Sequence, residues 1–262
     1  MLQTPDQWHK RYREQARWTK DLRQYLYRRA GVEKARRILD LGCGTGVLAE
    51  ELGDITQSEI HCLDIKPEVM PIVVGENPEA MPVIGDAQSL PYNSESFDIA
   101  LCHFLLLWVS SPPRVLSEMI RVTRTGGIVM ALAEPDYGGR IDYPEELGKL
   151  GELQMDSLRL QGADPLIGRK LAGLFSSAGL SKVEIGVLGG QWSRDIMVTE
   201  FESEWEVLKS DLAYLSNNSS VGNSPGSEAE LNQLKELGGA ASQRGARVLF
   251  VPTFYAWGIK PE

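Results

Sequence analysis

The sequence predicts an α/β protein in which a mostly parallel β-sheet carries helices on both faces. Two observations lead to this prediction. From residue 36 onward, short apolar runs with strand character alternate with segments of helical spacing. A glycine-rich turn at residues 42–46 joins the first apolar run to the first of these helices. Successive strands that are linked by helices pair in parallel, and the helices then cover both faces of the sheet.

The elements follow from these patterns in chain order. Residues 5–30 place aromatic and apolar side chains at spacings of three and four, which predicts one long helix. Strands are then expected at residues 37–41, 59–63, 81–84, 97–102 and 126–133, with helices at 46–53, 67–74 and 112–122. Later in the chain we expect helices at 145–161, 166–178, 199–214 and 227–243, and strands at 182–192 and 247–259. Residues 217–227 are rich in Ser, Asn and Gly, which is typical of a mobile loop.

The composition indicates a soluble protein with no nucleic-acid or membrane partner. Of the 262 residues, 42% are hydrophobic, which is enough for one large domain or for a domain with a modest insertion. Acidic residues outnumber basic ones by 36 to 27, whereas nonspecific nucleic-acid binding needs a basic surface. The longest apolar run, residues 104–109, is too short to cross a bilayer, and the Arg-rich start contains no apolar signal segment. We therefore expect a cytoplasmic protein.

Three cysteines lie in or beside predicted strand ends, at Cys43, Cys62 and Cys102. An odd and scattered set favours reduced, buried thiols over a disulfide framework. The same spacing gives no metal-binding pattern, so no metal is expected.

The stretch from Asp40 to Gly46 reads Asp-Leu-Gly-Cys-Gly-Thr-Gly and carries the clearest functional signal. Glycines at alternate positions let the backbone approach a ligand closely and adopt positive φ angles without strain. The helix that follows exposes N–H groups with positive dipole character. A carboxylate at the strand end, beside such a turn, suits a cationic or hydroxyl-bearing ligand better than a bare phosphate.

Residues 36–190 resemble the class I S-adenosylmethionine-dependent methyltransferases that act on small molecules. The resemblance begins with motif I at residues 40–46 and continues through four further landmarks in the same order. These are the strand ending at Asp64, Gly85-Asp86-Ala87, Phe97 to His103, and Gly126 to Ala131. The resemblance implies a Rossmann-like, seven-stranded sheet whose last strand is antiparallel.

The resemblance also implies S-adenosyl-L-methionine as the cofactor, and it assigns roles along one edge of the sheet. Asp64 is expected to accept hydrogen bonds from both ribose hydroxyls. Asp40 is expected near the methionine ammonium, and Asp86 at the adenine amino group. The other residues expected around the cofactor occupy strand ends or the turns after them: Gly42, Cys43, Gly44, Gly46, Ile65, Ala87, Cys102 and His103.

The regions outside the landmarks are interpreted by the same resemblance. Residues 1–35 are expected to form a helical lid, with Arg13, Arg17 or Trp18 near the cofactor carboxylate; the alternative is an aromatic stripe packed on the core. Residues 36–262 form the methyltransferase domain, with helical insertions near 137–165 and 199–246.

The acceptor chemistry is less defined. His103 is the candidate general base because its ordinary pKa of about 6.5 allows proton abstraction near neutral pH. The alternative is a hydrogen-bonded residue of the cofactor wall, and Glu134 and Asp136 are competing bases. The motif Asn/Asp-Pro-Pro-Tyr/Phe is absent after the fourth strand, which disfavours N-methylation of nucleic-acid bases. Several aromatic residues suggest a small, largely apolar acceptor in a pocket: Trp108, Tyr137, Trp192, Trp205, Phe254 and Trp257.

The predicted function is methyl transfer from S-adenosylmethionine to O, N or C of a small molecule, by in-line displacement. Two alternatives stay open. The chain could bind the cofactor as a sensor without turnover. It could also be an NAD-dependent oxidoreductase, because Gly44, Gly46 and Ala49 fit a dinucleotide fingerprint with Asp64 near the ribose position.

Overall fold

A computed structural model describes residues 5–187, 194–218 and 227–262. The chain divides into two compact units. Unit 1 contains the residues up to Glu134 together with Ile167–Val187 and Phe254–Glu262. Unit 2 contains Pro135–Leu166 and Leu188–Thr253.

Unit 1 is built on a seven-stranded sheet with the order β3-β2-β1-β4-β5-β9-β7. The strands are β1 (Arg37–Leu41), β2 (Glu59–Asp64), β3 (Met81–Ile84), β4 (Phe97–Cys102), β5 (Thr123–Pro135), β7 (Ser181–Val187) and β9 (Thr253–Ile259). The pairings of β1 with β2, β1 with β4, β2 with β3 and β4 with β5 are all parallel. β9 runs antiparallel to β7. The predicted Rossmann-like fold with an antiparallel last strand is confirmed.

The strand order reverses between β1 and β4, and this reversal positions the site. From β1 the chain adds β2 and β3 on one side, and then returns to add β4 and β5 on the other. Asp40 in β1 lies opposite Cys62 of β2 and opposite Leu101 of β4. In open α/β sheets, ligands bind at the carboxyl ends of the strands at such a reversal.

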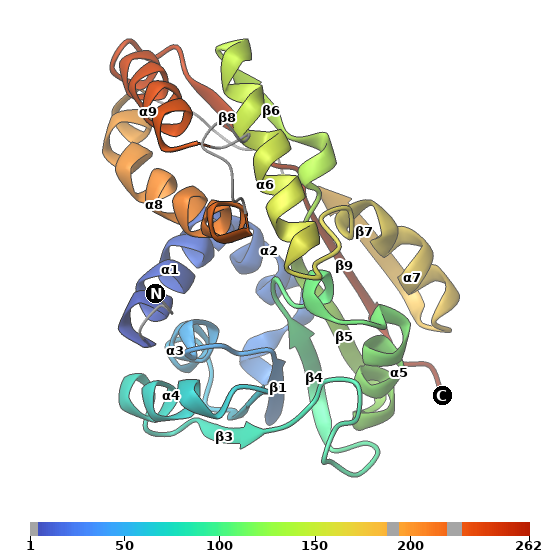
Figure 1. Ribbon diagram of the computed structural model, residues 1–262. Helices are drawn as coiled ribbons and strands as arrows, with labels where there is room; N and C mark the ends of the chain where they lie inside the picture. Colours follow the sequence, from blue (N-terminus) through green and yellow to red (C-terminus); the bar gives the residue numbers. More distant parts are fainter. Residues whose placement is uncertain (1–4, 188–193, 219–226) are drawn as a thin grey trace. The chain divides into compact units, whose positions relative to one another are not determined.

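Helices complete unit 1 (Figure 1). They are α1 (Pro5–Trp18), α2 (Lys20–Ala30), α3 (Val47–Gly53), α4 (Met70–Glu76), α5 (Pro112–Val122) and α7 (Leu171–Ser177). Leu26 of α2, Leu52 of α3 and Val73 of α4 are fully buried in one core cluster with β1 and β2. α5 and α7 pack against each other (Figure 1).

Two predicted elements are wrong in detail. The single helix at 5–30 is two helices, because the backbone at Thr19 leaves helical geometry with φ −112° and ψ 12°. The single strand at 247–259 is also two elements, β8 (Val248–Phe250) and β9, with Pro252 between them. Proline has no N–H for a strand ladder, so the pairing breaks there.

Other elements shift only at their ends. β5 is longer than predicted, and short 3-10 turns precede α4 (70–76), α6 (Gly148–Leu160) and α7 (171–177). The last residues of the strand expected at 182–192, with Trp192, lie outside the described residues, and so does most of the loop expected at 217–227.

Unit 2 has a helical core of its own. α6, α8 (Arg194–Asn218) and α9 (Glu228–Gln243) bury a shared set of side chains: Leu147, Leu150, Leu153, Phe201, Trp205, Leu208, Leu212 and Leu234. A short strand, β6 (Ile141–Tyr143), pairs antiparallel with β8. Arg140 forms a buried ion pair with Asp142 and donates to Gln154, which in turn donates to Asp211. The segments expected as insertions near 137–165 and 199–246 both belong to this unit.

Candidate functional site

The glycine turn after β1 has the backbone geometry that only glycine adopts easily. Gly42, Gly44 and Gly46 have φ angles of 69°, 53° and 82°, all in the left-handed region. The amides of Gly42 and Cys43 donate to the Leu63 carbonyl at 2.7 and 3.1 Å, so the turn is held against the end of β2. The helix α3 begins directly after the turn.

Asp64 ties the tip of β2 to this turn. Its Oδ2 accepts a hydrogen bond from the Gly44 amide at 2.9 Å, and its Oδ1 accepts one from the Lys66 amide at 3.0 Å. The residue is half-buried, so the carboxylate keeps an open side. Each carboxylate oxygen can accept more than one hydrogen bond, which leaves capacity for ligand hydroxyls.

Asp40 is almost completely buried at 1% exposure. Burial raises its pKa to about 8, the negative charge of Asp64 adds to the rise, and Arg23 opposes it. Its Oδ2 has no hydrogen-bond partner among the described residues. A buried carboxyl oxygen without a partner is costly by itself, and a cationic donor such as an ammonium group would satisfy it and favour the charged form.

The end of β3 completes this edge. The Gly85 amide donates to the Asp64 carbonyl at 3.0 Å, which places the residues after β3 beside the tip of β2. Asp86 is exposed and accepts from the Gln88 amide at 2.8 Å, while Ala87 is buried. Ile65 is 64% exposed, so it offers an apolar surface to a ligand. The three predicted carboxylates therefore lie on adjoining strand ends.

The fourth strand contributes Cys102 and His103. Cys102 is fully buried, and burial together with the charge of Glu134 raises its pKa well above the ordinary range. His103 Nε2 lies 2.8 Å from Thr19 Oγ1. Burial and the positive charge of Arg23 hold the pKa of His103 well below its usual value, so the imidazole is neutral.

Cys43, the remaining turn residue, points inward. The residue is 9% exposed, and its thiol donates to the Gly44 carbonyl at 3.6 Å. The pKa of Cys43 is raised well above the ordinary range, mainly by a hydrogen bond with the Cys62 side chain and secondly by burial. The three cysteines are free thiols.

The first helix reaches the turn through side chains that the sequence reading did not select. A Cβ atom on Gly44 would lie 2.8 Å from Cε2 of Tyr12, so the tyrosine ring covers the turn. His9 Nδ1 lies 2.9 Å from Thr45 Oγ1. The sequence feature that could have identified Tyr12 is its position among the regularly spaced aromatic residues of this helix. In the structure its ring packs on Trp8, with 5.5 Å between the ring centroids.

The residues predicted on this helix as cofactor contacts are at least partly exposed. Arg17 pairs with Glu14 at 3.2 Å, and Trp18 is 43% exposed. Arg13 pairs with Glu50 and Glu76 at 2.8 and 3.2 Å. The assignment of Arg17 and Trp18 to the cofactor stays a prediction.

The sequence analysis also did not select a buried arginine in α2, Arg23. Arg23 is 1% exposed and forms a two-point ion pair with Glu51 of α3. It also donates to the Thr19 hydroxyl at 2.6 Å. No local pattern marks Arg23, because it stands among other basic residues on a helix of mixed polarity.

Glu134 anchors the loop after β4 from the end of β5. Its Oε1 accepts from the Leu105 and Leu106 amides, both at 3.0 Å, and its Oε2 has no partner among the described residues. Burial raises its pKa to about 7, although the backbone hydrogen bonds oppose the rise. Asp136, the other competing base, is buried within unit 2.

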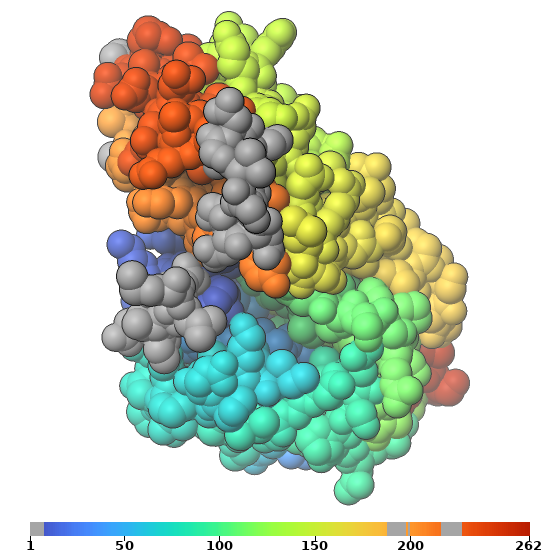
Figure 2. Space-filling view, in the orientation of Figure 1, coloured from blue at the N-terminus to red at the C-terminus, as the bar shows by residue number. Residues whose placement is uncertain are grey.

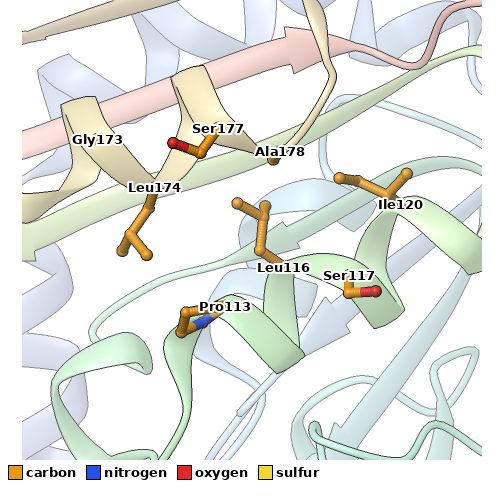
Figure 3. A pocket seen from close by; sticks show the side chains of 8 residues that line it. All are labelled: Pro113, Leu116, Ser117, Ile120, Gly173, Leu174, Ser177 and Ala178. Carbon is orange, nitrogen blue, oxygen red and sulfur yellow. The ribbon is translucent and has the colours of Figure 1, made fainter.

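A separate groove on unit 1 lies between α5 and α7, away from these carboxylates. Figure 3 shows its lining, which is mainly apolar: Pro113, Leu116, Ser117, Ile120, Gly173, Leu174, Ser177 and Ala178. Apolar side chains are also exposed near the edge strand, with Val74 at 46%, Met81 at 41% and Ile84 at 59%. Figure 2 shows the segment from α4 to β3 at the surface. The residues that line the groove between α5 and α7 include none with a charged side chain.

The described helices include none with the length and apolarity that a bilayer span requires. Within the same residues, no group of three or more His, Cys, Asp or Glu side chains could hold a metal ion.

Known proteins share the domain and the fold of this chain. Residues 39–131 match the family model described as a methyltransferase domain. A demethylmenaquinone methyltransferase of Renibacterium salmoninarum is 31% identical over 132 residues, which cover 49% of this chain and 55% of that protein. The chain thus spans about half the length of the curated relatives it matches.

Solved structures share the fold at lower identity. The phosphoethanolamine N-methyltransferase 2 of Haemonchus contortus, in complex with S-adenosyl-L-methionine, has a TM-score of 0.59 at 14% identity, covering 93% of this chain and 53% of that one. The cyclase SpnF has a TM-score of 0.58 at 19% identity, covering 94% and 80%. The domain match, the related sequences and the fold together identify residues 39–131 as a methyltransferase domain, within a chain that has the fold of class I S-adenosylmethionine-dependent methyltransferases.

Proposed function

We propose that this chain binds S-adenosylmethionine at the carboxyl edge of its sheet and transfers the methyl group to a small-molecule acceptor. One observation carries the proposal. The buried Asp40 has an unpartnered oxygen beside a glycine turn that Asp64 closes. In a molecule that joins an amino acid moiety to a ribose, the ammonium group would be the missing partner of Asp40. The ribose hydroxyls of the same molecule would donate to Asp64.

The residues of this edge would divide the work of binding. Asp64 would accept from the ribose hydroxyls, Asp40 would pair with the ammonium, and Asp86 would accept from the adenine amino group. Ile65 offers the apolar surface against which a flat ring packs. The backbone of residues 42–46 would pass beneath the methionine moiety, and its positive φ angles make that close approach possible.

When bound, the cofactor supplies a methyl group that is already activated on a positively charged sulfur. The protein then has to orient the acceptor, exclude water and accommodate the acceptor proton. Orientation of two reactants can contribute about 7–11 kcal/mol of barrier lowering. The loop after β4, which Glu134 anchors, carries His103 at the same edge of the sheet.

Two findings support a small-molecule acceptor. The relatives described above are named for methylation of demethylmenaquinone and of phosphoethanolamine, both small molecules. The chain also has Cys-His-Phe-Leu at residues 102–105, where nucleic-acid base methyltransferases carry Asn/Asp-Pro-Pro-Tyr/Phe. The likeness to a cyclase means that the fold alone does not define the reaction, so the chemistry has to be measured.

Calorimetry with S-adenosylhomocysteine tests the binding site. We expect Asp64→Asn to weaken binding by about 10- to 100-fold, because each hydrogen bond to a charged group contributes roughly 1.5–3 kcal/mol. Asp98→Asn is the matched control: Asp98 also accepts from two backbone amides, those of Arg36 and Arg37 at 2.7 and 2.9 Å, but at the amino end of β4. Equal affinities of the two variants would overturn the site.

Transfer of a radiolabelled methyl group into metabolite extracts tests the reaction. Labelled product that disappears in Asp64→Asn supports methyl transfer. A tight cofactor complex without product from any extract would instead indicate a sensor. Saturable binding of NADH with no binding of S-adenosylhomocysteine would indicate an oxidoreductase.

A further inference from the structure

The break between α1 and α2 brings a hydroxyl group to the candidate site. Thr19 lies between the two helices with non-helical backbone angles, and it is only 6% exposed. Its side chain therefore points inward, toward the loop after β4. There it meets His103, which is 84 positions away in the sequence.

Three groups compete for the Thr19 hydroxyl. Arg23 Nη1 lies at 2.6 Å, His103 Nε2 at 2.8 Å and the Ala16 carbonyl at 3.3 Å. A guanidinium can only donate, so the Arg23 contact uses an oxygen lone pair. The single hydroxyl proton must then go either to Ala16 or to His103.

The distances and the charges favour His103. The Ala16 carbonyl already accepts from Arg23 Nη1 at 2.5 Å and from the Thr19 amide at 3.2 Å, and its contact with the hydroxyl is the longest of the three. A proton on His103 Nε2 would also point toward the oxygen that binds the Arg23 guanidinium. The shorter contact therefore favours an arrangement in which the Thr19 hydroxyl donates to an unprotonated Nε2.

We propose that Thr19 is a positioning residue that holds His103 as the neutral tautomer protonated on Nδ1. Nδ1 makes no hydrogen bond within the part of the chain that the structure describes, and the residue is partly exposed. His103 thereby offers a hydrogen-bond donor to an oxygen of a ligand at this edge, and it is not a general base. The ligand part of this inference rests on the proposed function.

The surroundings of Thr19 keep the arrangement rigid. Arg23 is fixed by its two-point ion pair with Glu51, so the guanidinium cannot leave the hydroxyl without breaking a buried contact. A side-chain orientation that is locked by its neighbours is what precise placement of a donor requires.

Nitrogen-15 NMR of histidine-labelled protein tests the tautomer without any cofactor. The chain has three histidines, so a His103→Gln sample assigns the signals. We expect a protonated Nδ1 and an unprotonated Nε2 at neutral pH. Thr19→Ser should preserve this pattern, and Thr19→Val, which removes the hydroxyl at similar size, should shift it toward a mixture of tautomers. A protonated Nε2 in the wild type, or no change in Thr19→Val, would overturn the proposal.

Measuring kcat of His103 variants distinguishes a hydrogen-bond donor at this position from a general base. Glutamine offers N–H donors but cannot accept a proton near neutral pH, so His103→Gln should keep kcat within about 10-fold of the wild type, while His103→Ala should lose more. A pH-independent loss of all turnover in His103→Gln would contradict the donor role. Circular dichroism establishes that each variant is folded. Because the NMR result does not depend on methyl transfer, failure of the proposed function and failure of this inference are distinguishable.

Discussion

The Gly44 amide donates a hydrogen bond to the Asp64 carboxylate at 2.9 Å, which joins the glycine turn to the tip of the next strand. Twenty positions separate the two residues in the sequence. The turn and the acidic residue are therefore preorganised relative to each other before any ligand binds.

Gly44→Ala should weaken both folding and cofactor binding. A residue with a Cβ pays about 1–2 kcal/mol in the left-handed region. In addition, the new Cβ would lie 2.8 Å from the Tyr12 ring, at a site where φ is +53°. Urea unfolding and calorimetry with S-adenosylhomocysteine would measure the two losses.

Gly75→Ala is the control for this change. Gly75 lies in α4, and a Cβ there would meet no atom within 4 Å. Alanine is favoured over glycine in a helix by about 0.5–1 kcal/mol, so this variant should be as stable as the wild type or slightly more. A Gly44→Ala protein with the same stability and affinity as Gly75→Ala would contradict our view of the turn.

The sheet and the turn could be predicted from sequence because their signals are local. Each strand is an apolar run that ends at turn-forming residues, and Asp40, Asp64 and Asp86 follow three of these runs directly. The parallel connection rule then places the three acids on one edge without any knowledge of distant contacts.

The features that sequence reasoning missed depend on distant partners. Thr19 interrupts a helical pattern, and its hydroxyl contacts Arg23 and, from another element, His103. β6 has only three residues, and its pairing with β8 divides the expected last strand. The residues near Thr19 and near β8 contain no pattern that identifies these distant partners. Periodicity alone therefore predicts one helix and one strand where the structure has two of each.

Cofactor binding at pH 7 should release up to about one proton from Asp40. The raised pKa of about 8 keeps this carboxyl mostly protonated in the free protein. An ammonium group beside Oδ2 would favour the charged form and expel the proton. Calorimetry in buffers of different ionisation enthalpy counts the released protons. Asp40→Asn should release none from this site, and equal release by both proteins would show that another group is responsible.

Glu134 should make the stability of unit 1 depend on pH. Its pKa rises from 4.5 to about 7 on folding, so the folded protein holds this proton more tightly than the unfolded chain does. The resulting stabilisation is complete below pH 4.5 and is lost as the pH rises through about 7. Glu134→Gln keeps an acceptor for the Leu105 and Leu106 amides but cannot ionise.

Urea unfolding at pH 5 and pH 8 tests this expectation. The free energy of unfolding of Glu134→Gln, relative to that of the wild type, should be greater at pH 8 than at pH 5. Glu134→Ala, which leaves two amides without their acceptor, should lose about 1–3 kcal/mol for a buried unsatisfied donor at either pH. A constant difference between Glu134→Gln and the wild type would mean that the carboxyl does not titrate in this range.

The buried Arg23 should contribute far more to stability than the exposed Arg13, although each pairs with glutamates. Removing one partner of a buried ion pair leaves the other charge uncompensated, which costs about 3–5 kcal/mol. Glu51 retains some solvent contact, with 20% of its side chain exposed, so the lower end of that range is expected for Arg23→Ala. Arg13 is 48% exposed, and exposed pairs contribute about 0–1 kcal/mol, so Arg13→Ala should be close to the wild type. Urea unfolding of the two variants at the same pH measures the difference, and a Glu51→Gln protein with normal stability would show that the Arg23 charge is compensated by other groups.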